Sequence, residues 1–228
     1  LGIGRRGKYL LVELSSSFTL IISLRMTGRL VFVPSGQEVE RDKHTHLIFE
    51  FDDGSSLYFN DIRKFGTMHC VPGNCVETCP EIAKLGPEPL GEDFTEEWLR
   101  DKLRKTGRKI KQVLLDQTFI AGIGNIYADE VLFHAGIHPE AVANKLSPEQ
   151  VHKLHLAIRD VLSEAVLQRG TTFRDYVDGL GYAGNYQSFL KVYGRKGKKC
   201  YNCGREIETV RLGGRTSSFC PFCQREGS

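Results

Sequence analysis

Short apolar runs alternate with turn residues through the first 71 positions of the chain. The runs Lys8–Leu14 and Phe18–Ser23 are β-branched or aliphatic and are separated by serines, which indicates two strands. Asp52-Asp53-Gly54 is a tight-turn signal. Further strands of the same kind are predicted at 29–33, 45–51, 56–60 and 66–71. Because no helical period lies between them, the pattern favours an antiparallel sandwich or barrel over a parallel sheet.

The pattern changes at residues 72–92, where proline and glycine recur and predict a linker. Beyond it, Thr95 is the predicted N-cap of a helix with Glu96 and Glu97 in its first turn. A second helix is predicted over 108–117. These signals place a helical region after the β region.

Two further helices are predicted downstream. Asn125 is expected to cap a helix that runs to Gly136, a natural C′ residue. The segment 147–150, Ser-Pro-Glu-Gln, combines a capping box with proline at the first helical position, and it opens a long amphipathic helix. From Val192 onward the helical period stops. The chain is therefore predicted to be an α+β multidomain protein.

Composition adds little, but the distribution of charge adds more. The 228 residues are 40% hydrophobic and 26% charged, as in ordinary globular proteins, and are enough for two domains. No run of eighteen apolar residues predicts a membrane span. The formal charge is only +3, yet basic residues concentrate at 100–111 and at 191–215. The second island predicts contact with a phosphate backbone.

The second basic island contains the first half of a predicted metal site. Two Cys-x-x-Cys pairs, sixteen residues apart, are the ligand set of a structural zinc ribbon. A pair of disulfides is the alternative, and the lack of a secretory signal disfavours it. The predicted ligands are Cys200, Cys203, Cys220 and Cys223.

Three cysteines remain, Cys70, Cys75 and Cys79, beside His69. Their irregular spacing predicts free thiols, although a second metal site is conceivable. An odd total of seven cysteines, four of them ligands, indicates a reducing cytoplasm.

A glycine turn, Gly122-Ile-Gly-Asn125, precedes a predicted helix. Exposed N–H groups and an amide side chain at such a turn suit a phosphate. Taken alone the turn more often has no ligand, but together with the basic ribbon it predicts a second phosphate clamp.

Five blocks followed by the four cysteines resemble the bacterial formamidopyrimidine-DNA glycosylase family over essentially the whole chain. The blocks are Leu24–Gly28, Asp61–Gly66, Leu85–Leu90, Ala121–Glu130 and Val192–Arg195. The resemblance implies an N-terminal β-sandwich (1–71), a linker (72–92), a helix–two-turn–helix domain (93–190) and a zinc ribbon (191–228), with DNA in the cleft between. It also implies one structural zinc ion and a loop at 178–186, with glycines typical of a mobile lid, that closes over the lesion.

The function implied is excision of oxidised purines, such as 8-oxoguanine and formamidopyrimidines opposite cytosine, from double-stranded DNA. The resemblance implies a mechanism of base flipping, imine formation and β,δ-elimination. It also implies a monomer in the bacterial cytoplasm, associated with the nucleoid. In the family a proline followed by glutamate starts the chain, and the proline amine is the nucleophile. Here Gly4–Lys8 matches the family's second block and that start is absent. We therefore expect this chain as given to bind lesion DNA without processing it, and to give no borohydride-trapped adduct.

Three residues match the family's void-filling set: Met26 as an apolar wedge, Arg63 facing the orphaned cytosine and Phe65 as an aromatic plug. A planar guanidinium suits an acceptor edge. Without the resemblance, Met26 and Phe65 would be interpreted as ordinary sheet core. A Gln-Leu-Tyr set would instead indicate the related endonuclease VIII group, which acts on oxidised pyrimidines.

The resemblance implies catalytic roles for Lys8 and Arg215. Lys8 is expected to contact the lesion's phosphate and to transfer a proton in β-elimination, although a lysine in such a basic run is commonly a solvated surface charge. Arg215, in the loop of the ribbon, is expected to stabilise the departing phosphate, because an arginine stays protonated. We expect it opposite Asn125 across the cleft.

The remaining DNA contacts also follow from the resemblance. They are His44, Lys105, Arg108, Asn125, Arg174 and Tyr193. His44-Thr45-His46 could alternatively be a metal pair, but no carboxylate partner at useful spacing supports it. Thr172 and the glycines 179, 181 and 184 would belong to the lesion-capping segment.

Two other functions remain open at this point. A non-catalytic zinc-ribbon protein could hold duplex DNA with the ribbon and the glycine turn, although it would need no void-fillers such as Met26 and Phe65. An endonuclease VIII-like glycosylase would prefer oxidised pyrimidines.

Overall fold

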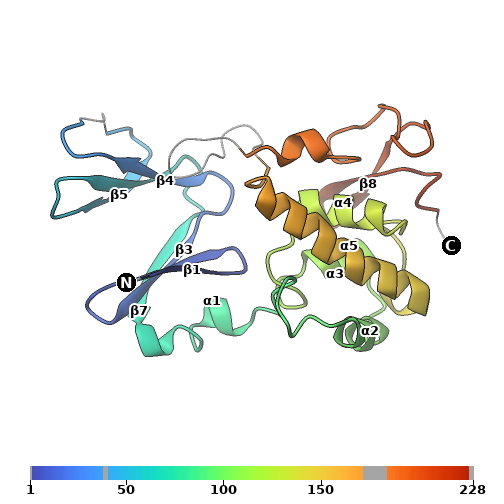
Figure 1. Ribbon diagram of the computed structural model, residues 1–228, viewed down its shortest axis with the longest axis horizontal. Coiled ribbons are helices and arrows are strands. Elements are labelled where there is room, and N and C mark those ends of the chain that lie inside the picture. Colours follow the sequence, from blue (N-terminus) through green and yellow to red (C-terminus); the bar gives the residue numbers. More distant parts are fainter. Residues whose placement is uncertain (1, 38–40, 172–183, 226–228) are drawn as a thin grey trace. The chain divides into compact units, whose positions relative to one another are not determined.

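The computed structural model describes residues 2–37, 41–171 and 184–225, which divide into two compact units (Figure 1). The first unit contains the chain up to Ala83 together with Gln168–Gln187, and the second contains Lys84–Leu167 together with the chain from Ser188 onward. Among the helices of the described ranges, none has the length and apolar character that crossing a membrane requires.

The first unit is built from two antiparallel sheets (Figure 1). One sheet has the strand order β1-β2-β3-β7 and the other β4-β6-β5. The strands are β1 (Ile3–Arg6), β2 (Tyr9–Glu13), β3 (Phe18–Ser23), β4 (Gly28–Val33), β5 (Thr45–Glu50), β6 (Ser56–Asp61) and β7 (Thr67–Pro72). The predicted antiparallel β architecture is confirmed.

Strand β1 was not predicted, because Ile3-Gly-Arg-Arg6 shows no apolar alternation. It is a strand because it pairs with β2, from Ile3 opposite Val12 to Arg6 opposite Tyr9. The core of the two sheets includes Ile21 and Phe59, which are almost fully buried.

The segment predicted as a linker is not devoid of structure. It contains the short helices η1 (Gly73–Cys75) and α1 (Pro80–Ala83), and the side chain of Ile82 in α1 is buried. Beyond it, the second unit carries most of the helices: α2 (Glu96–Arg104), α3 (Ile110–Leu115), α4 (Asn125–His134), η2 (Ala143–Lys145) and α5 (Pro148–Leu167). A further short helix, η3 (Tyr186–Phe189), spans the boundary between the units.

The predicted caps of α2 and α5 are confirmed. The Thr95 hydroxyl accepts from the Trp98 N–H at 3.1 Å. At α5, the Gln150 N–H donates to the Ser147 hydroxyl at 3.2 Å, and the Ser147 N–H donates to the Gln150 side chain at 2.8 Å. This reciprocal pair is the capping box expected from the sequence.

Two helix boundaries differ from the prediction. Helix α3 is shorter than 108–117 because the backbone is extended at Lys109 and again at Asp116. Helix α4 is capped by Gly124, whose backbone is extended, so Asn125 is the first helical residue and not the cap. The Asn125 side chain instead donates to the backbone carbonyl of Thr216.

The zinc-ribbon hairpin consists of β8 (Glu208–Leu212) and β9 (Arg215–Phe219). Gly213 and Gly214 both have positive φ, +54° and +77°, which suits a two-residue hairpin turn that twists with its strands. The small core of the ribbon contains Phe133 from α4 together with Val192, Cys200, Ile207 and Cys220. The ribbon therefore packs on α4 through a side chain that is not its own.

Candidate nucleic-acid interface and metal centre

Met26, Arg63 and Phe65, here called the wedge trio, come together on the surface of the first unit. Met26 lies between β3 and β4, whereas Arg63 and Phe65 follow β6. Met26 is 70% exposed and Phe65 is 54% exposed. The Arg63 Nη1 donates to the Met26 Sδ at 3.2 Å, and its guanidinium carbon lies 5.1 Å from the centre of the Phe65 ring. Two exposed apolar side chains thus flank one guanidinium, so the interpretation of Met26 and Phe65 as sheet core is wrong.

Asp61, which sequence reasoning did not single out, joins the two loops of the wedge trio. Its buried carboxylate accepts from the Thr27 hydroxyl, from the Arg63 N–H at 3.1 Å and from the Gly66 N–H at 2.7 Å. Burial by itself would raise the pKa of Asp61, but these hydrogen bonds outweigh it and hold the pKa below its usual value. The carboxylate is therefore charged at neutral pH.

Both wedge loops contain a non-glycine residue in the left-handed region. Arg25 has φ of +51° and Lys64 has φ of +57°. Such residues are uncommon, and they persist where the surroundings fix the conformation. In the first loop the Gly28 N–H donates to the Leu24 carbonyl, and a Cβ on Gly28 would lie 2.5 Å from that oxygen. The loop that presents Met26 therefore requires glycine at position 28.

In the second unit Arg215 and Asn125 are neighbours. Arg215 is exposed and is the first residue of β9, directly after the turn, rather than a loop residue as predicted. The Asn125 Nδ2 donates to the carbonyl of Thr216 at 3.1 Å. The expectation that the two residues lie on opposite sides of a cleft is wrong, because strand β9 is hydrogen-bonded to the start of α4.

A buried ion pair holds β9 in place. The Lys111 ammonium contacts the Asp129 Oδ1 and donates to the Thr216 carbonyl at 3.2 Å, while the Ser218 N–H donates to the Asp129 Oδ2 at 2.9 Å. Burial raises the pKa of Asp129 to about 6 and lowers the pKa of Lys111, which the charge of Arg215 lowers further. Lys111 belongs to the basic island 100–111, but it is fully buried. Its charge serves the hairpin instead of facing DNA.

Glu130 holds the segment that enters the ribbon. Its fully buried carboxylate accepts from the N–H groups of Lys191 at 2.8 Å, Val192 at 3.0 Å and Tyr193 at 2.8 Å. Sequence reasoning missed this residue. The available signal was a pair of acids, Asp129-Glu130, inside an otherwise apolar helix, where unpaired charges are not tolerated.

The other predicted DNA contacts differ in solvent exposure and in whether another side chain already pairs with them. Lys8 is exposed in the turn between β1 and β2, His44 is half-buried before β5, and Lys105 is exposed at the end of α2. Arg108 is exposed but forms an ion pair with Asp116 at 2.8 Å. Tyr193 is half-buried above Glu130. Thr172, Arg174 and most of the predicted lid, 178–183, lie outside the described residues.

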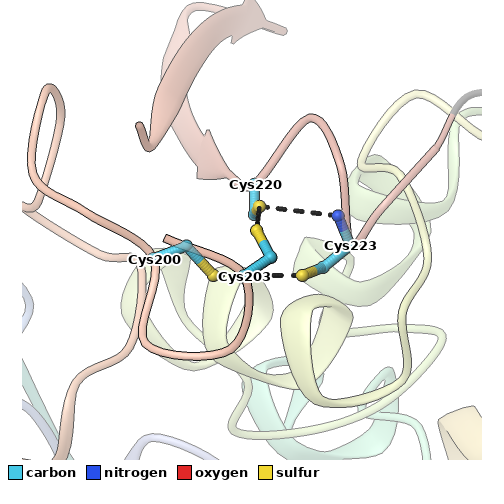
Figure 2. Close-up of side chains that lie close together, drawn as sticks. All are labelled: Cys200, Cys203, Cys220 and Cys223. Atoms are coloured by element: carbon cyan, nitrogen blue, oxygen red, sulfur yellow. Dashed lines mark hydrogen bonds between the residues drawn. The ribbon is translucent and has the colours of Figure 1, made fainter. Parts of the chain in front are cut away.

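The four ribbon cysteines converge on one point (Figure 2). Their sulfur atoms all lie within 4.8 Å of one another, with Cys203 and Cys220 at 3.5 Å and Cys200 and Cys223 at 3.9 Å. Zinc–sulfur bonds of about 2.3 Å in a tetrahedron separate two sulfurs by about 3.8 Å, whereas a disulfide requires about 2.05 Å. The donor set therefore fits one structural zinc ion, and the disulfide alternative is wrong.

Comparisons with known proteins agree with this geometry. Three family models match: the formamidopyrimidine-DNA glycosylase N-terminal domain at residues 1–68, its H2TH domain at 85–177, and a zinc finger found in FPG and IleRS at 197–225. The formamidopyrimidine-DNA glycosylase of Pelotomaculum thermopropionicum is 52% identical over 99% of this chain and 81% of its own length. The chain belongs to the formamidopyrimidine-DNA glycosylase family.

Solved structures of this family support the assignment. A complex of the Lactococcus lactis enzyme with DNA containing an abasic site has a TM-score of 0.92 at 44% identity, and covers 99% of this chain and 82% of that one. A complex of MutM with DNA containing carbocyclic 8-oxo-G has a TM-score of 0.91 at 44% identity, with coverage of 99% and 81%. The protein is a DNA repair glycosylase of the formamidopyrimidine-DNA glycosylase family, its partner is DNA, and its cofactor is one structural zinc ion.

Proposed function

We propose that the protein recognises oxidised purines paired with cytosine and flips them out of the duplex by means of the wedge trio. The observation that carries this proposal is the contact of the Arg63 guanidinium with both Met26 and Phe65 on an exposed surface. A flipped base leaves a gap in the stack and an unpaired partner. Two apolar side chains fill such a gap, and the guanidinium between them meets the acceptors of the orphaned cytosine.

The phosphate contacts in the second unit are proposed to centre on Arg215 and Asn125. Arg215 is exposed at the tip of the hairpin, and Asn125 is tied to the same strand. A Cβ on Gly213 would lie 3.4 Å from the Gln112 side chain, so the tip packs near α3. A guanidinium at such a turn suits a phosphate oxygen.

Arg215 and Lys8 are the proposed catalytic side chains. Arg215 would stabilise the negative charge that develops on the departing phosphate, because a guanidinium supplies a positive charge and several N–H donors. Lys8 is proposed to transfer a proton during β-elimination, and its exposed position in the β1–β2 turn leaves it accessible to the sugar-phosphate backbone.

The remaining contacts are proposed as phosphate or backbone contacts of the bound duplex. They are His44, Lys105, Arg108, Tyr193 and Arg174. We also propose the domain boundaries given from the sequence, at 71, 92 and 190. Among these residues, Arg108 is the least favoured as a phosphate contact, because its ion pair with Asp116 already neutralises its charge.

The zinc ion supplies structure when bound and no chemistry. Four thiolates complete a tetrahedron and leave no position for a water molecule. The side chains of the chain hold the hairpin from the other side, through Lys111, Asp129 and Asn125. The ribbon is thus fixed at both its metal end and its strand β9.

Replacing Arg63 tests the proposal most directly. Binding to duplexes that carry 8-oxoguanine opposite each of the four bases should show a preference for cytosine, and Arg63→Ala should reduce that preference by about 1–3 kcal/mol. The exposed arginine Arg29 of β4 provides the matched control, Arg29→Ala, which should leave the preference intact.

The same titration with an oxidised pyrimidine separates the alternative substrate class. A Lactococcus lactis relative has been solved with DNA containing an oxidised pyrimidine. If this protein bound that lesion more tightly than 8-oxoguanine, or if Arg63→Ala left the opposite-base preference unchanged, oxidised purines opposite cytosine would not be its preferred substrate.

We further propose that the protein acts as a monomer at the bacterial nucleoid. The bacterial source of its relatives and the nature of its DNA partner support this location. Sedimentation of the DNA complex should give the mass of one chain and one duplex, and a mass corresponding to two chains would contradict the monomer.

A further inference from the structure

Two exposed aromatic rings lie at the metal end of the ribbon and have no role in the lesion site. Tyr201 lies between Cys200 and Cys203 and is 67% exposed, and Phe222 lies between Cys220 and Cys223 and is 43% exposed. Neither ring belongs to the core of the ribbon. Exposed rings contribute little to folding, and here one stands on each of the two metal-binding turns.

Each ring is flanked by two positive side chains. The Arg195 guanidinium carbon lies 3.7 Å from the centre of the Tyr201 ring and the Lys191 ammonium lies 5.3 Å from it. Arg205 and Arg225 lie 5.1 Å and 4.6 Å from the centre of the Phe222 ring. We call Tyr201, Phe222 and these four cations the knuckle surface.

The knuckle surface is already ordered before any ligand arrives. The Arg195 guanidinium donates to the carbonyls of Lys191 at 2.6 Å and Lys199 at 3.0 Å, which holds it beside Tyr201. Even with this arginine in place, two thirds of the Tyr201 surface faces solvent. A ligand can therefore contact the ring without displacing the arginine.

The knuckle surface is separate from the phosphate site proposed at the hairpin tip. Arg215 pairs with Leu212 beside the turn, whereas Phe219 pairs with Glu208 at the other end and leads directly into Cys220. Four residues of extended strand span about 13 Å. A phosphate held by Arg215 and Asn125 thus leaves the rings of Tyr201 and Phe222 uncovered.

The chemistry of the knuckle surface fits unpaired nucleic acid. Residues 191–225 contain nine lysines and arginines against two carboxylates, Glu206 and Glu208, which favours a polyanion. Bases in a duplex are already stacked on one another, whereas unpaired bases stack on exposed aromatic side chains while cations bind their phosphates. Each ring here has two cations beside it, which supplies both kinds of contact.

We propose that the knuckle surface binds a second, single-stranded DNA segment while the lesion site holds its duplex. Tyr201 and Phe222 stack on bases, and Arg205 and Arg225 contact the adjacent phosphates. This function goes beyond lesion recognition and does not depend on the identity of the lesion.

The test is a binding titration with the lesion site already filled. The full chain is saturated with an unlabelled hairpin duplex that carries an abasic-site analogue opposite cytosine. Fluorescein-labelled oligothymidylate of about twelve nucleotides is then titrated, and its anisotropy is followed. We expect a ternary complex, with affinity reduced on the order of tenfold or more in the Tyr201→Ala, Phe222→Ala double variant.

Two controls keep the result specific. Lys102 lies 5.7 Å from the Trp98 ring on α2, so Lys102→Gln alters a similar cation–aromatic pair far along the chain and should have no effect. The double variant must retain one zinc ion per chain and its affinity for the lesion duplex. A second variant, Arg205→Gln with Arg225→Gln, leaves both rings in place and should also weaken oligothymidylate binding.

Several outcomes would overturn the proposal. Loss of oligothymidylate binding on saturation with the duplex would show that only one site exists. The surface would recognise charge alone if two results came together. The first is equal affinity for a labelled undamaged duplex or for an oligoaspartate peptide, and the second is no effect of the aromatic substitutions.

Discussion

Asp61 shows how one buried carboxylate can organise two exposed loops. Thr27 is 34 positions away from it in the chain, yet both residues contact the same backbone N–H group of Arg63. Because Met26 adjoins Thr27 and Phe65 follows Arg63, the carboxylate fixes both apolar members of the wedge trio. The side chains proposed to meet DNA thus depend on a buried carboxylate that is not itself a proposed contact.

We expect Asp61→Asn to reduce the free energy of unfolding by about 1–3 kcal/mol at pH 7, because an amide cannot accept from both the Arg63 and Gly66 N–H groups. The folded-state pKa of Asp61 lies below the unfolded value of about 3.8, so its stabilisation is complete above about pH 5. It is lost as the pH falls through the lowered pKa. The difference between wild type and variant should therefore shrink in acid.

Urea unfolding at a series of pH values from 7 to 2.5 measures this difference. The exposed Asp52, in the turn between β5 and β6, provides the matched control Asp52→Asn. A wild-type advantage that persisted unchanged at the lowest pH would contradict the role given to the charged form of Asp61.

Glu130 performs a similar task between elements, because it connects α4 to the segment that leads into the ribbon. Three backbone N–H groups converge on its carboxylate. Glu130→Gln replaces one acceptor oxygen by a donor and should cost about 1–3 kcal/mol in unfolding free energy. We also expect weaker DNA binding, because the ribbon carries Arg215.

The exposed Glu149, paired with Lys153 on α5, provides the control Glu149→Gln, which should change stability by only a few tenths of a kcal/mol. Thermal unfolding and a zinc assay check both variants. Wild-type stability and DNA affinity in Glu130→Gln would show that the three hydrogen bonds are dispensable.

Local signals in the sequence predicted most of the elements, and the exceptions have physical causes. The caps at Thr95 and Ser147 depend on neighbouring residues, so their pattern is visible in the sequence. Strand β1 exists only through its pairing with β2, which no local pattern records. Helix α4 begins one residue earlier than expected, with Gly124 as its cap, and the Asn125 side chain bonds to β9 instead of to its own helix.

In the candidate site, too, local features could be predicted from the sequence, whereas features that depend on tertiary contacts could not. The spacing of the cysteines was sufficient to predict the zinc ligands, because each pair is local. The roles of Met26, Arg63 and Phe65 came only from a family resemblance, and Asp61 and Glu130 were missed altogether. Acids are commonly solvated, and only the fold shows that these two are buried among N–H donors.

At the scale of the whole molecule, the ribbon's metal and its arginine should be separable by mutation. We expect Cys203→Ala to abolish both zinc retention and DNA binding, since three thiolates no longer close the hairpin. Arg215→Ala should retain one zinc ion per chain, weaken binding and reduce the slope of log K against log salt by about 1.

Zinc content and fluorescence titrations at several salt concentrations distinguish the two variants. The exposed Arg211 of β8 provides the control Arg211→Ala, which tests whether any arginine of the hairpin has the same effect. Full DNA affinity in Cys203→Ala would mean that the metal does not position Arg215.

Phe133 limits how the zinc ribbon can be transferred to another protein. A zinc finger of this kind is found in FPG and in IleRS, which suggests a portable module. In this chain, however, one wall of its core is a phenylalanine from α4. A ribbon cut out at residue 191 would carry its four ligands but expose the surface that Phe133 covers. A protein into which this ribbon is grafted must therefore supply an apolar side chain in place of Phe133. Grafting the four cysteines alone would leave the ribbon's core incomplete.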